Sequence, residues 1–250
     1  MENKSTVYCL GELVHNEEVT KSLEEKGMVT ISSIDEAPCK STVLIRAHGE
    51  PPITYQKAKE KQIEIIDLTC PKVLTIHKQA EEYKNKGYFV IYIAEKGHPE
   101  TIGTMGFLEE AGFLVQSEED IDKLPQKEKY AVLSQTTFSM EKFDKIVDKL
   151  KEKIDSIEIN KTICDATRIR QEETKQIASN VDTMIIIGGK SSSNTKKLYE
   201  IASKNCKNAY FVQTAQDLKQ IPKCEKIGIM AGASTPGHLI QEVQSKLANN

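Results

Sequence analysis

The stretch YFVIYIAEKGHPETIGTMG (Tyr88–Gly106) decides the fold class of this chain. Its first half, Tyr88–Ala94, is a continuous apolar run rather than an alternating one, which is typical of a parallel strand covered on both faces. A polar cluster with His98 and Glu100 follows where a helix would begin. Because open α/β proteins build their sites at the carboxyl ends of strands, the stretch predicts an α/β fold with its chemistry at one sheet edge.

The same order of an apolar run and then small, polar or reactive residues recurs along the chain. The other clusters are AHGEPP (Ala47–Pro52), TCPKV (Thr69–Val73), SQTTFS (Ser134–Ser139), ICDATRIRQ (Ile163–Gln171), GGKSSSNT (Gly188–Thr195) and AGASTPG (Ala231–Gly237). Strands that alternate with amphipathic helices predict mostly parallel sheets. The pattern divides the chain into three comparable α/β units, at residues 1–70, 71–162 and 163–250.

The composition argues against several classes of function. The chain has 250 residues, of which 38% are hydrophobic and 28% charged, as in a soluble globular protein. A net charge of −3 gives no electrostatic reason to bind nucleic acid or an anionic membrane. No apolar run could span a bilayer, and the N-terminal MENKSTVY is not a signal peptide. We therefore expect a cytoplasmic protein without a membrane or nucleic-acid partner.

Two of the six cysteines differ from the rest in their neighbours. Cys70 and Cys164 each follow a strand and precede a helix, where backbone N–H groups and the helix dipole favour a thiolate. They could hold a metal shared between units, or they could be two inert core cysteines. The remaining four are expected to be small buried residues, namely Cys9, Cys39, Cys206 and Cys224. Without a CxxC pair or a secretory signal, disulfides are not expected.

The clusters GGKSSSNT and AGASTPG place glycine and hydroxyl groups where a strand passes into a helix. Free backbone N–H groups together with Ser192, Ser193, Asn194 and Ser234 would form a pocket for an oxyanion. The alternative is ordinary capping of the helix by serine and asparagine. Two such turns in one chain favour a phosphate ligand.

Three of the histidines lie in polar turns: His15 in LVHN, His48 in AHG and His98 in GHPE. Matching turns suggest hydrogen bonding to a polyanion. Glu100 would be a proton donor if it is buried near the ligand, or else a first-turn carboxylate that favours the helix dipole. His77, inside a helix, is expected to be structural.

The motifs LVHN, AHG, TCP, GHPE-x-x-GTMG, QTT, IC-x-AT-x-x-RQ, K-x-SSN and AGAS-x-P cover nearly the whole chain. In this order they resemble the 4-hydroxy-3-methylbut-2-enyl diphosphate reductases of the non-mevalonate isoprenoid pathway. The resemblance implies three α/β units in a trefoil around a central site, with the first unit incomplete. It implies reductive dehydroxylation of the allylic diphosphate to isopentenyl and dimethylallyl diphosphates, with electrons from a ferredoxin or flavodoxin.

The resemblance also assigns roles to residues. It implies an oxygen-sensitive [4Fe–4S] cluster held by three cysteines, two of which correspond to Cys70 and Cys164. The proton-delivering glutamate corresponds to Glu100 and its partner threonine to Thr136. The residues implied to bind the diphosphate are His15, His48, His98, Ser192, Ser193, Asn194 and Ser234.

One motif of the family, a Gly-Phe-Cys-x-Gly-Val turn near the N-terminus, has no counterpart here, and Cys9 does not replace it by motif. With two of three thiolates, we expect a cluster that is labile or unfilled, and little reductase activity from this chain alone. We also expect a sheet edge and apolar faces of the first unit to be uncovered.

Two other classes of protein stay open. A non-catalytic diphosphate-binding remnant without a cluster would need none of Cys70, Cys164 and Glu100, so their retention argues against it. A zinc hydrolase is the other alternative, and no helix carries the HExxH pair that would support it.

Overall fold

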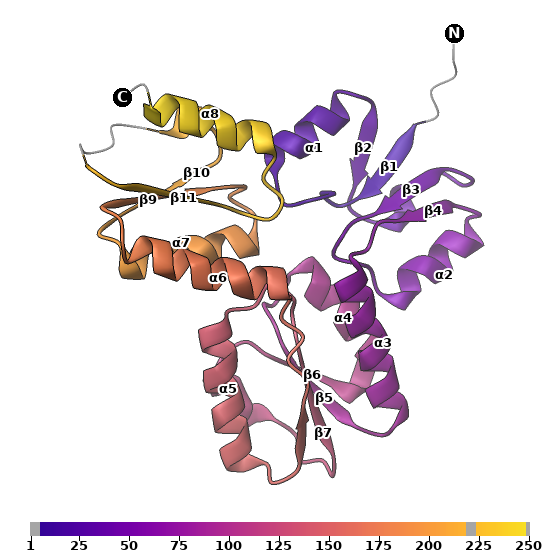
Figure 1. The fold of residues 1–250 in the computed structure, drawn as a ribbon. Helices are drawn as coiled ribbons and strands as arrows, with labels where there is room; N and C mark the ends of the chain where they lie inside the picture. Colours follow the sequence, from indigo (N-terminus) through magenta and orange to yellow (C-terminus); the bar gives the residue numbers. More distant parts are fainter. Residues whose placement is uncertain (1–5, 219–223, 249–250) are drawn as a thin grey trace. The chain divides into compact units, whose positions relative to one another are not determined.

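The computed structural model describes residues 6–218 and 224–248. The chain divides into two compact units. The larger unit comprises Met1–Leu13 and Glu24–Cys164, and the smaller unit comprises Val14–Leu23 and Asp165–Asn250. The three-way division by residue number stays a prediction, but three separate parallel sheets are present, as the sequence predicts (Figure 1).

The larger unit holds two four-stranded parallel sheets and the smaller unit one three-stranded parallel sheet. The first sheet contains β1 (Val7–Leu10), β2 (Met28–Ile31), β3 (Thr42–Ile45) and β4 (Glu64–Asp67). The second contains β5 (Phe89–Ile93), β6 (Gly112–Val115), β7 (Tyr130–Ser134) and β8 (Ile157–Ile159). The third contains β9 (Thr183–Ile187), β10 (Asn208–Val212) and β11 (Ile227–Ala231).

All three sheets repeat one strand order. The orders are β2-β1-β3-β4, β6-β5-β7-β8 and β10-β9-β11. In each sheet the earliest strand therefore lies inside, with the second strand of the chain on one side and the third on the other. The chain changes direction across the sheet between the first and third strands, and ligands of open α/β proteins bind at such switch points.

Eight helices connect and cover the strands described. They are α1 (Glu17–Glu24), α2 (Pro52–Glu60), α3 (Pro71–Asn85), α4 (Pro99–Leu108), α5 (Met140–Lys153), α6 (Asp165–Ala178), α7 (Ser193–Asn205) and α8 (Gly237–Ala248). Three of them begin with proline at the first helical position, where its missing N–H has no intrahelical acceptor to bond. None of the described helices is both long and apolar enough to cross a membrane.

The second and third sheets are covered on both faces. In the second sheet, α5 packs Phe143 and Leu150 on one face, while α3 and α4 pack Ile76 and Leu108 on the other. In the third sheet, α6 and α7 cover one face and α8 the other (Figure 1). This explains why β5, β7 and β9 are buried along their whole length.

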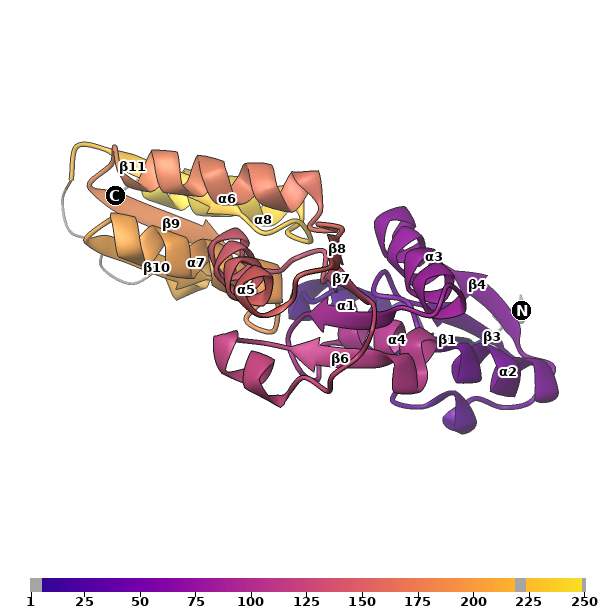
Figure 2. The same ribbon diagram turned by 90° about the horizontal axis from the view of Figure 1, so that it is seen from below.

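The first sheet is covered unevenly. One face packs Leu10, Val43 and Ile45 into a single core cluster with Ala58 of α2, which lies along this face (Figure 2). On the other face Leu44 is half-buried and its neighbour in register, Ile66, is 42% exposed. Cys9, the neighbour of Leu44 in register on β1, is fully buried. This face is therefore covered at β1 and partly exposed at β4, which agrees only in part with the expectation of uncovered apolar faces.

Candidate functional site

Nearly all the predicted site residues follow the strands that flank a switch point. His48 follows β3 in the first sheet; His98 and Glu100 follow β5, and Thr136 follows β7, in the second. In the third sheet the serine–asparagine turn follows β9, and Ser234 follows β11. The two predicted metal ligands occupy equivalent positions in two different sheets. Cys70 follows β4 and Cys164 follows β8, and each of these is the fourth strand of its sheet.

Glu100 lies at the centre of a buried hydrogen-bond network in the larger unit. It is 1% exposed. Its Oε1 accepts the backbone N–H of Thr136 at 2.7 Å, and its Oε2 accepts the Thr136 hydroxyl at 2.6 Å. The hydroxyl of Tyr92 also donates to Oε1, at 3.3 Å. The structure thus brings Glu100 and Thr136 together, although 36 residues separate them in the chain.

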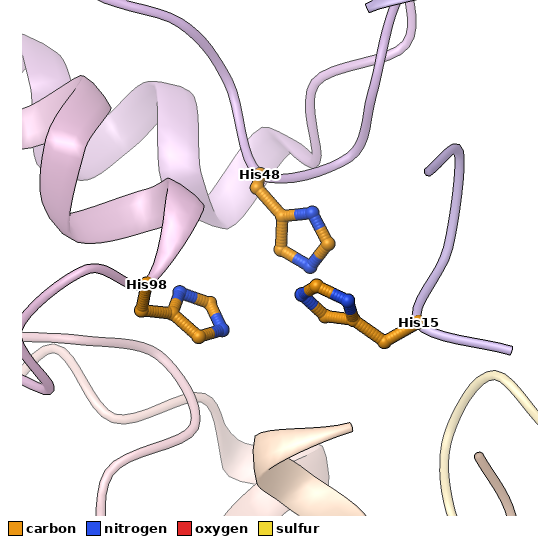
Figure 3. A group of neighbouring side chains, drawn as sticks. All are labelled: His15, His48 and His98. Carbon is orange, nitrogen blue, oxygen red and sulfur yellow. The ribbon is translucent and has the colours of Figure 1, made fainter. Parts of the chain in front are cut away.

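His98 and His48 lie next to this network. His98 is the N-cap of α4, and its Nδ1 accepts the backbone N–H of Glu100 at 3.2 Å. The rings of His98 and His48 meet edge to face, with centroids 5.3 Å apart (Figure 3, which also labels His15). The larger unit therefore presents two partly buried imidazoles beside a buried carboxylate.

The backbones of Cys70 and Cys164 are anchored to the same turns. The N–H of Cys70 donates to the carbonyl of Ala47, the residue before His48, at 3.0 Å. The N–H of Cys164 donates to the carbonyl of Thr136 at 3.0 Å. Both thiols are free and partly exposed, and Cys70 is the N-cap residue of α3. Free, accessible thiols at a helix start are suited to bind a soft metal.

The other cysteines only partly follow the expectation of burial. All six are free, and Cys9 and Cys206 are buried. Burial raises the pKa of the Cys9 thiol to about 11, so this cysteine is protonated and inert at neutral pH. The prediction of burial was wrong for Cys39, which is exposed in a turn, and for Cys224, which is partly exposed in a loop.

His77 supports the turn that carries His48. It is 4% exposed in α3 and stacks on Phe107 of α4, with ring centroids 4.4 Å apart. Burial lowers the pKa of His77 to about 4, against a smaller opposing effect of Asp67, so the ring is neutral near pH 7. A Cβ at Gly49, which has φ +72°, would lie 2.6 Å from the His77 ring. Only glycine lets the turn approach so closely, which agrees with the expected structural role of this histidine.

In the smaller unit, the turns after β9 and β11 are pressed against each other. A Cβ at Gly232 or Gly188 would overlap the hydroxyl of Thr195. The N–H of Gly232 donates to the carbonyl of Ile187, the last residue of β9, at 2.8 Å. Thr195 therefore packs between the two glycine turns, and the turn of Ser234 lies beside the turn of Ser192.

The serines and the asparagine at the start of α7 differ in their partners. Ser192 is the N-cap, and its Oγ accepts the Thr195 N–H at 3.2 Å, so the capping interpretation is correct for this residue. Asn194 is only 7% exposed, yet neither Nδ2 nor Oδ1 has a hydrogen-bond partner among the described residues. Because buried polar groups are almost always paired, such an amide indicates a place for a ligand.

His15 reaches these turns through the segment before α1. Asn16 caps α1 by accepting the N–H of Val19, and its Nδ2 donates to the Ser234 carbonyl at 3.4 Å. A Cβ at Gly189 would overlap the carbonyl oxygen of His15. His15 therefore belongs to the smaller unit, together with the third sheet.

Lys197 is a residue of this region that the sequence did not single out. It is 5% exposed in α7, and its Nζ donates to Ser193 Oγ at 2.7 Å. Its only signal in the sequence is the four-residue spacing from Ser193, which places both on one face of a helix.

Three comparisons with known proteins agree with one another. The family model described as LytB protein matches residues 1–248. The chain is 40% identical over 251 residues to the 4-hydroxy-3-methylbut-2-enyl diphosphate reductase of Clostridioides difficile, covering 99% of this chain and 90% of that protein.

Two solved structures are also similar. The E-1-hydroxy-2-methyl-but-2-enyl-4-diphosphate reductase of Plasmodium falciparum aligns with a TM-score of 0.93 and 34% identity, covering 99% of this chain and 79% of that one. A structure of (E)-4-hydroxy-3-methyl-but-2-enyl diphosphate reductase, the terminal enzyme of the non-mevalonate pathway, aligns with a TM-score of 0.72 and 37% identity. That alignment covers 100% of this chain and 90% of the other.

Proposed function

The chain belongs to the LytB family, and from this premise we propose that it reductively removes the hydroxyl group of 4-hydroxy-3-methylbut-2-enyl diphosphate. The C–O bond of the substrate breaks, and two electrons and two protons are consumed. One proton leaves with the hydroxyl as water, and the other enters the carbon skeleton. The products are isopentenyl and dimethylallyl diphosphates.

The environment of Glu100 carries the proposal. Two donors from Thr136 fix both carboxyl oxygens of the Glu100 side chain, and this residue is only 1% exposed. A fixed carboxyl group is suited to deliver a proton to a defined atom, here the leaving hydroxyl, directly or through the Thr136 hydroxyl. A protein that only bound diphosphate would gain nothing from it, because a buried carboxylate repels phosphate.

The residues proposed to bind the diphosphate are histidines and polar groups at the start of α7. His48 and His98 of the larger unit can each donate a hydrogen bond from a ring nitrogen. The smaller unit contributes hydroxyl and amide groups at a helix N-terminus, where backbone N–H groups and the helix dipole favour an anion. Its proposed ligands are His15, Ser192, Ser193, Asn194 and Ser234.

The cysteines are suited to an iron–sulfur cluster. Thiolates are the protein ligands of such clusters, and Cys70 and Cys164 are free, partly exposed and placed alike after two fourth strands. We propose that they supply two of the ligands of a [4Fe–4S] cluster. When bound, the cluster would supply electrons and a Lewis-acidic iron, with a ferredoxin or flavodoxin as the external donor.

Anaerobic reconstitution tests the function. The chain is loaded with excess iron and sulfide, analysed for both, and assayed for the two product diphosphates with reduced ferredoxin. We expect the variants Cys70→Ser and Cys164→Ser to bind less iron and to lose turnover, while Cys39→Ser, at an exposed cysteine, serves as the control.

The outcomes separate the alternatives. If wild type binds the substrate but takes up no iron even with excess iron and sulfide, and forms no product at all, the diphosphate-binding remnant is favoured. A labile cluster with low but measurable turnover supports the reductase. A wild type that holds a full, stable cluster would contradict the expectation that a cluster with only two of its three cysteine ligands is labile.

A further inference from the structure

Lys197 places a buried positive charge at the start of α7. It is 5% exposed, and its Nζ lies 2.7 Å from the Oγ of Ser193, the first residue of the helix. Side chains on a helix lean toward its N-terminus, so this long side chain runs back along one turn. The ammonium group therefore lies at the end of the helix that already carries partial positive charge.

The ammonium group and the partial charge of the helix dipole have the same sign, so both favour an anion at this helix end. The amide of Asn194, buried and without a partner at the next position, independently indicates that a polar ligand binds there.

We propose that Lys197 is a positioning residue for the diphosphate, acting through the hydroxyl of Ser193. The ammonium group can only donate, so in this bond the Ser193 oxygen is the acceptor. The Ser193 hydrogen is then left to point at a phosphate oxygen, and the neighbouring charge makes it a stronger donor. This inference rests on the proposed function, since it takes Ser193 as a diphosphate ligand.

The chain supplies a matched control at the next residue. Lys196 lies on the same helix but is exposed. Lys196→Met and Lys197→Met therefore remove the same charge from adjacent positions and keep a side chain of similar length. Only the second removes the contact with Ser193.

The probe is inorganic diphosphate, titrated into the full chain by calorimetry without a cluster. We expect Lys197→Met to weaken binding roughly 10- to 100-fold, as for loss of a charge-assisted hydrogen bond, and Lys196→Met to change it by about twofold at most. Lys197→Arg, which keeps the charge, should recover part of the affinity. Circular dichroism and the thermal midpoint identify any variant that is misfolded.

A double-mutant cycle with Ser193→Ala tests the route of the effect. If Lys197 acts through Ser193, the loss in the double variant is much smaller than the product of the two single losses. If Lys197→Met does not fold, Ser193→Ala still decides, because an unchanged affinity in that variant overturns the inference.

Failure of the inference and failure of the proposed function give different results. The role of Lys197 is refuted, and the function stands, if wild type and Lys197→Met bind diphosphate with equal affinity. The same holds if Lys196→Met loses as much affinity as Lys197→Met. If wild type does not bind inorganic diphosphate at millimolar concentration, the proposed diphosphate pocket itself is wrong.

Discussion

The turn around Glu100 and the turn around Asn194 bury polar groups in opposite ways. Both lie at the start of a helix that follows the first strand of a sheet. The carboxylate of Glu100 accepts hydrogen bonds from the Thr136 N–H, the Thr136 hydroxyl and the Tyr92 hydroxyl. The amide of Asn194 has no partner among the described residues.

Under the proposed function, this difference corresponds to two separate tasks. A group that must transfer a proton benefits from being fixed before the substrate arrives, because no reorganisation is then needed at the moment of reaction. A group that must bind the ligand keeps its hydrogen-bonding capacity free and accepts a cost in the ligand-free protein. Four changes test this contrast.

The largest effect is expected from Glu100→Gln. The amide keeps the size of the side chain and can still bond to Thr136, but it has no proton to deliver. We expect the turnover of the loaded enzyme to fall by roughly 10²- to 10⁴-fold, the usual contribution of general acid catalysis. Inorganic diphosphate should bind within a few-fold of wild type. The exposed Glu110→Gln is the control, and an equal loss of affinity and turnover in Glu100→Gln would refute the division of tasks.

His77 provides a reference, because one nitrogen of its buried ring, Nε2, has no hydrogen-bond partner among the described residues and no ligand is proposed for it. Burial lowers the pKa of His77 to about 4 from 6.5. Between those pH values the unfolded chain binds a proton that the folded chain does not. The free energy of unfolding should therefore fall as the pH decreases from about 6.5 toward 4, by about 3 kcal/mol in all.

Urea denaturation followed by circular dichroism at several pH values measures this effect. His77→Phe should flatten the pH dependence in that range, because phenylalanine can keep the stacking on Phe107. His238→Gln, at an exposed histidine, should leave the slope unchanged. A slope that persists in His77→Phe would assign the titration to another group.

A pair of threonines compares a bonded hydroxyl with an unbonded one. The Thr136 hydroxyl donates to Glu100, whereas Thr101, 3% exposed, has no partner for its Oγ1 among the described residues. Thr136→Val should lower the free energy of unfolding by about 1.5–3 kcal/mol, because a buried carboxylate loses a donor. Thr101→Val should be neutral or stabilising. Equal effects of the two substitutions in urea denaturation would show that the hydrogen bond to Glu100 contributes little.

Much of the fold follows from local patterns. Strands β5, β7 and β9 are buried throughout, and their continuous apolar runs identify them in the sequence. The strands β2 (MVTI) and β6 (GFLV) were missed, because a run of four residues is too short to tell a strand from a loop, and each is an edge strand with partly exposed residues.

The candidate site divides in the same way. Polar clusters after strands identify Glu100 and the histidines, because strand ends are visible in a sequence. The partners of those residues are not visible, since the contact of Glu100 with Thr136 spans 36 residues and that of Asn16 with Ser234 spans 218. Lys197 escapes notice because a single lysine in a helix is normally solvated, and only packing shows that it is buried.

The smallest change in stability is expected from Asn194→Ala. Removing an amide that has no partner removes a desolvation cost, and alanine favours the helix. The free energy of unfolding should therefore rise or stay within about 1 kcal/mol of wild type. Ser192→Ala, at the adjacent N-cap whose oxygen is bonded, should lower it by about 1 kcal/mol.

The affinity for diphosphate, in contrast to stability, should respond strongly to the loss of the Asn194 amide. We expect Asn194→Ala to weaken the binding of inorganic diphosphate by roughly 10-fold, because the ligand loses a buried hydrogen-bonding partner. An Asn194→Ala variant that loses stability but keeps its affinity would mean that the amide is structural. The contrast with Glu100 would then fail, since both turns would be fixed before the ligand arrives.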